Sequence, residues 1–211
     1  MSAREAADEI SNALRQATAL HQAGRLDEAE RLYRHVLGAA PGQADALHLL
    51  GVLMAQTGRP FEAAELMNRS ISFDPANESA FYNRGNVLLD LKRFDEALES
   101  YDSALRIRSD HLGALINRGA ALQKLNRLQD ALASYERGLA LDPHSTALTF
   151  NKANTLRDLG LFEDAIAAYD RVLQRQPENF GALNNRGGTF LRMRRCQRFR
   201  RSSPKLCSSR R

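Results

Sequence analysis

The chain has 211 residues, of which 43% are hydrophobic and 26% charged, so it is too apolar for wholesale disorder and long enough to bury a sizeable core. Its apolar runs are far shorter than the roughly 20 residues that span a bilayer, and its acidic N-terminus is unlike a signal peptide, so we expect a cytoplasmic protein with no membrane span. Residues 1–189 carry 21 basic and 25 acidic side chains, a net charge of −4, whereas nine cations and no carboxylate follow residue 189. The formal charge of +5 therefore describes a C-terminal tail rather than the main domain.

From residue 10 onward the sequence repeats with a period of 34 residues. No insertion or deletion interrupts the register, and the units are 10–43, 44–77, 78–111, 112–145 and 146–179, with a partial unit at 180–189. We therefore predict a repeat domain over residues 1–189 and a separate basic tail over residues 190–211.

Small and bulky residues recur at fixed positions of these units. Positions 8 and 20 hold glycine or alanine, such as Gly51 and Ala63. Position 24 holds Tyr33, Met67, Tyr101, Tyr135 and Tyr169. Small residues let two helices touch, bulky residues fill the space around them, and a helix pair buries its apolar face only by stacking on its neighbours. Because no strand-like alternation occurs before residue 190, the pattern predicts an all-α solenoid of antiparallel helix pairs.

Turn and cap residues divide each unit into helix, tight turn and helix. Position 15 holds Gly24, Gly58, Asn126 and Gly160, which tolerate the left-handed conformation that closes a helix. Position 32 holds Pro41, Pro75, Pro143 and Pro177, which separate one unit from the next. Carboxylates at position 18, namely Asp27, Asp95 and Glu163, favour the start of each second helix, and Ser2 with Glu5 forms a candidate capping box.

These features resemble the tetratricopeptide repeat family over roughly residues 10–189. The resemblance is carried by Leu50-Gly51-x2-Met54 and by the alanines, tyrosines and prolines at positions 20, 24 and 32. It implies a right-handed superhelix of about five and a half units, whose first helices line a concave groove. The amino-acid sequence of the second and third units is also similar to that of bacterial arrays fused to O-linked N-acetylglucosaminyltransferase-like catalytic domains. No α/β pattern or glycine-rich phosphate loop of such a catalytic domain is present.

In that family, positions 5, 6 and 9 face the groove, and here positions 6 and 9 form a ladder of asparagines. The ladder consists of Asn83, Asn117, Asn151 and Asn185 at position 6, extended by Asn86 and Asn154 at position 9. An amide both donates and accepts hydrogen bonds, so it can pair with the backbone of a bound peptide whatever side chains the peptide carries. The alternative is that these amides bridge adjacent helices or meet water.

Position 5 adds an apolar stripe of Tyr82, Ile116 and Phe150, which either supplies side-chain pockets beside the ladder or belongs to the core. Catalytic, metal and cofactor sites are not expected, because the five histidines share no repeat position and the two cysteines, Cys196 and Cys207, both lie in the tail. Nor do we expect a small-molecule substrate.

From Leu191 onward the repeat pattern fails, so we expect a disordered or frame-disrupted tail. A basic arm for nucleic acid is the less favoured interpretation, because few aromatic residues accompany the cations. An incomplete last helix pair would leave Phe190 uncovered and promote self-association. The sequence thus predicts a non-enzymatic scaffold that binds an extended peptide of a protein partner in its groove. The alternative is the truncated recognition region of an O-GlcNAc-transferase-like glycosyltransferase.

Overall fold

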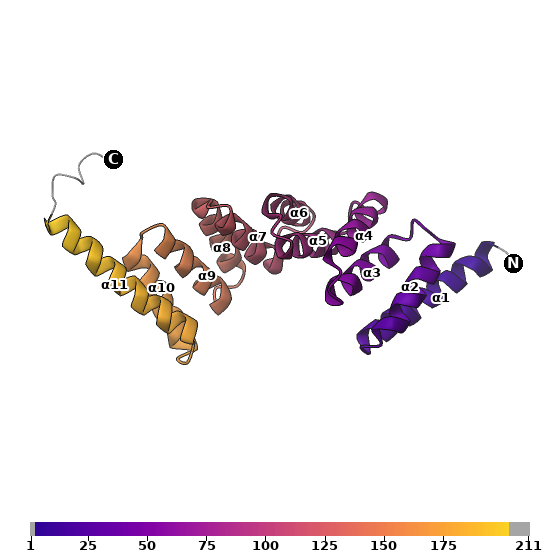
Figure 1. Ribbon diagram of the computed structural model, residues 1–211, viewed down its shortest axis with the longest axis horizontal. Helices are drawn as coiled ribbons and strands as arrows, with labels where there is room; N and C mark the ends of the chain where they lie inside the picture. The colour runs from indigo at the N-terminus through magenta and orange to yellow at the C-terminus, as the bar shows by residue number, and fades with distance from the viewer. Residues whose placement is uncertain (1–2, 203–211) are drawn as a thin grey trace. The chain divides into compact units, whose positions relative to one another are not determined.

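The computed structural model describes residues 3–202, and these residues form eleven α-helices and no strand (Figure 1). They divide into two compact units, residues 1–117 and 118–211, with α7 (Leu112–Lys124) spanning the division. The first unit contains α1 (Ala3–Gln22), α2 (Leu26–Ala39), α3 (Ala44–Gln56), α4 (Pro60–Phe73), α5 (Glu78–Asp90) and α6 (Phe94–Ile107). The second contains α8 (Leu128–Leu141), α9 (Thr146–Asp158), α10 (Phe162–Arg175) and α11 (Phe180–Ser202). The prediction of an all-α array of consecutive helix pairs is confirmed. No helix within residues 3–202 is long and apolar enough to cross a membrane.

The tight turns within the pairs adopt the left-handed conformation that the sequence predicts. Gly24, Gly58 and Gly160 have φ values of 75°, 76° and 79°, and Asn126 has φ 57°. The equivalent residue of the third unit, Lys92, also has a positive φ of 60°, although its residue type gives no hint of this. The register of the repeat, rather than local propensity, therefore dictates the turn at Lys92.

Side chains at position 34 cap the first helices of the pairs, a role that the sequence analysis did not assign. Asn77 Oδ1 accepts a hydrogen bond from Ala80 N at 3.0 Å, and Asn179 Oδ1 accepts one from Ala182 N at 3.0 Å. His111 caps α7 through Nδ1, which accepts from Ala114 N at 3.2 Å. The predicted carboxylates Asp27, Asp95 and Glu163 do lie in the first turns of the second helices. The candidate capping box at Ser2 lies outside the described residues.

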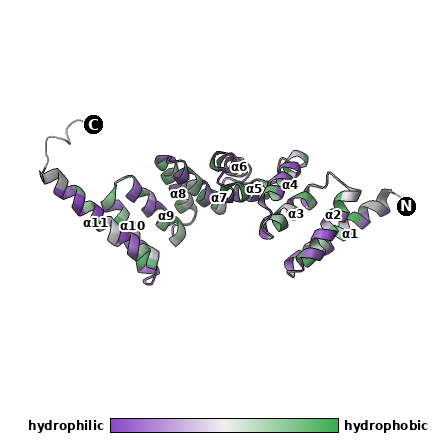
Figure 2. Ribbon diagram, in the orientation of Figure 1, coloured by the Kyte–Doolittle hydropathy of each residue, from purple (hydrophilic) through white to green (hydrophobic). Residues whose placement is uncertain are grey.

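The core follows the small and bulky positions of the repeat. The alanines at position 20 are fully buried, and so are the four tyrosines at position 24. The hydropathy colouring shows hydrophobic and hydrophilic residues interspersed along the helices (Figure 2). A Cβ built on Gly85 would lie 2.5 Å from Cε1 of Tyr101, so the tyrosine ring occupies the space that the missing side chain leaves.

The last helix continues past the predicted boundary at residue 190. Helix α11 runs without a turn from Phe180 to Ser202, so residues 190–202 are helical. Arginine, leucine, methionine and glutamine are good helix formers, and neither glycine nor proline interrupts this stretch. Residues 203–211, which include Cys207, lie outside the described part of the chain.

Candidate peptide-binding surface

The nine predicted site residues lie on the first helices of the pairs and are all half-buried. Tyr82, Asn83 and Asn86 lie on α5, Ile116 and Asn117 on α7, Phe150, Asn151 and Asn154 on α9, and Asn185 on α11. Two separate groups result, one in each compact unit, and each is described by itself.

In the first compact unit, residues 1–117, Asn86 and Asn117 link a buried tyrosine to the next helix. Asn86 Oδ1 accepts a hydrogen bond from Tyr101 Oη at 2.9 Å and a second from Asn117 Nδ2 at 2.8 Å. Burial raises the pKa of Tyr101, so its hydroxyl is a donor at neutral pH and needs an acceptor. The Asn86 carbonyl oxygen supplies that acceptor and joins α5, α6 and α7.

The second compact unit, residues 118–211, contains the same pairing of a tyrosine hydroxyl with two asparagines. Asn154 Oδ1 accepts from Tyr169 Oη at 2.6 Å and from Asn185 Nδ2 at 2.9 Å. Four of the six ladder amides therefore have a structural role, which is the alternative that the sequence left open. In the repeat unit 112–145, position 9 is Ala120, and Gln123 three residues later supplies the amide instead. Gln123 Oε1 accepts a hydrogen bond from Tyr135 Oη, and Gln123 Nε2 donates one to Thr155 Oγ1, both at 2.9 Å.

The two remaining ladder residues differ from these four and from each other. Asn83 Nδ2 lies 2.9 Å from Nε2 of His48, a residue that sequence reasoning did not place near the ladder. Burial lowers the pKa of His48, so its ring is neutral at neutral pH and can accept a hydrogen bond from the amide. Asn151 forms no side-chain hydrogen bond with any residue within 3–202, so both ends of its amide are available to a ligand.

The two aromatic residues of the apolar stripe, Tyr82 and Phe150, pack against other rings and are also partly exposed. The Tyr82 ring lies 4.5 Å from the His111 ring and 6.2 Å from the Tyr101 ring, centroid to centroid. Phe150 contacts Tyr169 edge-on at 6.1 Å. Since each ring is half-buried, it can pack against its neighbours and still contribute apolar surface.

A charged cluster lies at the start of α5, close to Tyr82. Glu78 Oε1 is 2.6 Å from Arg108 Nη2 and 3.8 Å from His111 Nε2. Burial, together with the Arg108 charge, lowers the pKa of His111, which keeps this imidazole neutral and able to cap α7. All three residues belong to the repeat unit 78–111, and none of them is among the predicted nine.

The chemistry of this surface suits an uncharged ligand backbone. The nine residues offer amide donors and acceptors beside aromatic and aliphatic side chains, and none carries a charge. Within the described residues, no group of three histidine, cysteine or acidic side chains is arranged to hold a metal ion.

Stacked helix pairs with this core define a helical repeat protein, and comparisons with known proteins name its family. Models of the tetratricopeptide repeat match residues 20–83, 77–144, 116–179 and 150–200. The chain therefore belongs to the tetratricopeptide repeat family. No curated protein matches it significantly.

Solved structures share the fold at low sequence identity. YrrB, described as a TPR protein with an unusual peptide-binding site, is 22% identical with a TM-score of 0.77, over 83% of this chain and 90% of YrrB. MamA is 20% identical with a TM-score of 0.73, over 77% of this chain and 95% of MamA. A tetratricopeptide repeat protein from Parabacteroides merdae ATCC 43184 is 17% identical with a TM-score of 0.79, over 97% of this chain and 81% of that protein.

Proposed function

We propose that this chain is a protein-interaction scaffold whose first helices bind an extended peptide segment. The observation that carries the proposal is the amide of Asn151, which is partly accessible and has no intramolecular partner within the described residues. It lies next in sequence to Phe150, so a peptide backbone group and an adjacent apolar side chain can be bound together. The peptide-binding site named for YrrB, which shares the fold, supports the same kind of ligand.

The four amides bonded to tyrosines or to each other support the proposal in a second way. Each uses one end of its amide in the bonds described above, and a primary amide has both donor and acceptor capacity. Their side chains are thereby held in fixed orientations, which lowers the entropy cost of binding a peptide.

The test separates binding from stability. An array of 15-residue peptides from the host proteome identifies ligands, and their affinity for Asn151→Ala is then compared with that for the unaltered chain. We expect about tenfold weaker binding, corresponding to about 1.4 kcal/mol, with no change in unfolding. Asn12→Ala, on the exposed face of α1, is the matched control. Unchanged affinity in Asn151→Ala would refute the proposal.

The alternative, a recognition region of an O-GlcNAc-transferase-like enzyme, gains no support from these comparisons. It would require a reading frame for α/β domains next to the coding region.

We also propose that the chain self-associates with a second copy through α11. Phe180 and Leu191 are 79% and 72% exposed, and a Cβ built on Gly187 would meet nothing within 4 Å, whereas the equivalent Gly85 is covered by Tyr101. An apolar helix face with an open small-residue position is a surface on which another helix can pack.

A further inference from the structure

An open groove of about 620 Å³ lies between α9 and α11 in the second compact unit. Arg157 of α9 and Arg192 of α11 line it, together with Asn185, Gly188 and exposed leucines of α11. Asn185 is also one of the nine residues of the peptide-binding surface, so the groove adjoins that surface. The lining residues include two cations and no carboxylate.

A glycine opens the way from the asparagines to these arginines. Gly188 holds position 9 of its unit, where Asn154 stands in the preceding one. A Cβ built on Gly188 would meet nothing within 4 Å. Residues three, four and seven positions apart share one face of a helix, so Gly188 and Arg192 continue the face that carries Asn185. A ligand held at the asparagines can therefore reach the arginines without displacing a side chain at position 9.

The two arginines keep most of their hydrogen-bond donors free. Arg157 Nε donates to Asp158 Oδ1 at 3.0 Å, and its Nη groups have no partner among the residues that the structure describes. Its side chain is only 24% exposed, which restricts where the guanidinium can lie. Arg192 forms no ion pair or hydrogen bond within the same part of the chain. Because a guanidinium has five N–H donors, both side chains can bond an acceptor in the groove.

Other cations of these two helices are neutralised by the second helices. Lys152 Nζ lies 2.8 Å from Glu136 Oε1 of α8, and Arg186 Nε lies 2.6 Å from Asp170 Oδ1 of α10. Residues 180–198 include five arginines and no carboxylate, and Asp158 is the one carboxylate of α9. The groove is therefore a place of excess positive charge, which attracts an anionic group.

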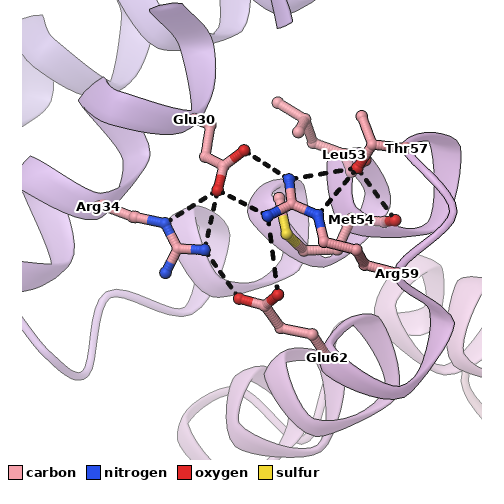
Figure 3. Close-up of polar contacts among 7 residues, drawn as sticks. All are labelled: Glu30, Arg34, Leu53, Met54, Thr57, Arg59 and Glu62. Atoms are coloured by element: carbon pink, nitrogen blue, oxygen red, sulfur yellow. Dashed lines mark hydrogen bonds and ion pairs between the residues drawn. The ribbon is translucent and has the colours of Figure 1, made fainter. Parts of the chain in front are cut away.

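The first compact unit shows the arrangement that the groove lacks (Figure 3). Glu30 Oε1 lies 2.8 Å from Arg34 Nη2, and Glu30 accepts two hydrogen bonds from the Arg59 guanidinium. Glu62 lies 2.8 Å from Arg34 and 3.8 Å from Arg59. Each of these arginines thus meets carboxylates from both α2 and α4. The chain supplies no such pair of carboxylates in the groove between α9 and α11.

We propose that this groove binds an acidic side chain of the peptide partner. The inference rests on the proposed function, because the asparagines beside the groove hold the peptide backbone. The carboxylate accepts hydrogen bonds from Arg157 and Arg192, and apolar side chains next to it contact Leu183 and Leu191, which are 44% and 72% exposed. A carboxylate suits two guanidinium groups better than a neutral amide does, since charge-assisted hydrogen bonds are about twice as strong. Nucleic acid suits the groove less well, because its lining holds no aromatic ring for base stacking.

The probe is the peptide acetyl-Ala-Leu-Glu-Glu-Leu-Ala-amide, and its matched control carries glutamine at both glutamate positions. The full chain is titrated at a concentration at which light scattering gives the monomer mass, and the amide NMR shifts of Gly187, Gly188 and Arg192 are followed. We expect saturable shifts with the glutamate peptide and about tenfold weaker binding of the glutamine peptide. Equal binding of the two peptides, or no saturable shift at these residues, would overturn the inference.

Arg192→Gln tests the groove itself, and its exposed position leaves the fold intact. We expect it to bind the glutamate peptide about tenfold more weakly and the glutamine peptide as before. Arg194→Gln is the matched control, because it removes the same charge from the same helix at an exposed residue outside the groove lining. Residues two positions apart do not share a helix face, so this variant should retain its affinity. An equal loss in both variants would mean that the attraction is diffuse and would refute the inference.

Asn151→Ala separates this inference from the proposed function. Weaker binding of both peptides in Asn151→Ala, without a preference for glutamate, would support the proposed function and refute the acid-binding groove. A preference for glutamate that depends on Arg192, with unchanged affinity in Asn151→Ala, would support the groove and refute the proposed function. Shifts at Gly187 and Gly188 that grow with chain concentration without peptide would assign the groove to a second copy and overturn the inference. So would displacement of the glutamate peptide by a single-stranded DNA oligonucleotide that binds more tightly.

Discussion

Individual residues at position 8 show how one repeat pattern produces different local environments. Gly85 lies against the Tyr101 ring, and the equivalent Gly187 lies in α11 with no neighbour within 4 Å of a built Cβ. Alanine is intrinsically better than glycine inside a helix by roughly 0.8–1.0 kcal/mol. The sign of a glycine-to-alanine substitution therefore depends on whether the added methyl group meets a packed neighbour.

For Gly85→Ala we expect a loss of about 1–2 kcal/mol in the free energy of unfolding, since overpacking against Tyr101 outweighs the helix preference. For Gly187→Ala we expect a gain of up to about 1 kcal/mol. Denaturant titrations followed by far-ultraviolet circular dichroism measure both values. Effects of the same sign in the two variants would show that the ring does not restrict this position.

At the scale of elements, polar contacts as well as apolar packing join successive helices. Tyrosine hydroxyls bonded to Asn86 and Asn154 connect the two helices of a pair in the core, and the amides of Asn117 and Asn185 extend these contacts to the next pair. The cluster around Glu30 connects α2 to α4 at the surface. The Arg59 guanidinium, and after it Arg34, lowers the pKa of Glu30 to about 2. Because this native pKa lies below the ordinary glutamate value of about 4.3, the ionised carboxylate stabilises the folded state.

We expect Glu30→Gln to lose about 1–2 kcal/mol of stability at neutral pH, a value that allows for solvent screening of its partly exposed arginine partners. In the unaltered chain this contribution is fully present above the unfolded pKa and is lost as the pH falls from about 4.3 toward about 2. Glu30→Gln should show a flatter stability profile over that interval. Urea midpoints measured at several pH values provide the comparison.

The matched control is Glu28→Gln, since Glu28 pairs with Arg25, the residue just before α2, and both side chains are about half exposed. An exposed pair of this kind contributes little, so no shift of the midpoint is expected. An equal loss in both variants would mean that the bridge between α2 and α4 adds nothing to stability.

At the scale of the whole molecule, charge and apolar surface are unevenly distributed. The described residues of α11 include arginines and no carboxylate, while residues 1–189 carry a net charge of −4. The same helix exposes Phe180 and Leu191. Attraction between unlike regions of two copies and burial of these side chains both favour association.

We therefore expect the average mass from light scattering to rise with protein concentration above 23.5 kDa. Leu191→Asp places a carboxylate on the exposed face of α11 and should lower the average mass at a given concentration toward the monomer value. Glu9→Asp, at an exposed position on α1, is a control that leaves α11 unaltered. A monomer at every concentration would rule out self-association.

The sequence by itself determined the helix pairs, because the 34-residue period links small residues, tyrosines, turn glycines and prolines to one repeated packing arrangement. Gly24, Gly58, Asn126 and Gly160 adopt the predicted turn, and the position 24 tyrosines are buried as predicted. The sequence also predicted that the asparagines bind a peptide. Residue type alone could not say whether an amide bonds to a ligand or to a neighbouring helix. Only the fold brings Tyr101 Oη to Asn86 Oδ1 and leaves the Asn151 amide without a hydrogen-bond partner among residues 3–202.

Tertiary structure likewise decided the contacts made between units of the repeat. His48 meets Asn83 from 35 residues away, and Arg59 meets Glu30 from 29 residues away. The helix at residues 190–202 follows from good helix formers once the chain has started a helix at Phe180, although the repeat pattern has ended. Periodicity specifies which surfaces stack. The side chains that face each other across each stack decide where bonds form and where a groove stays open.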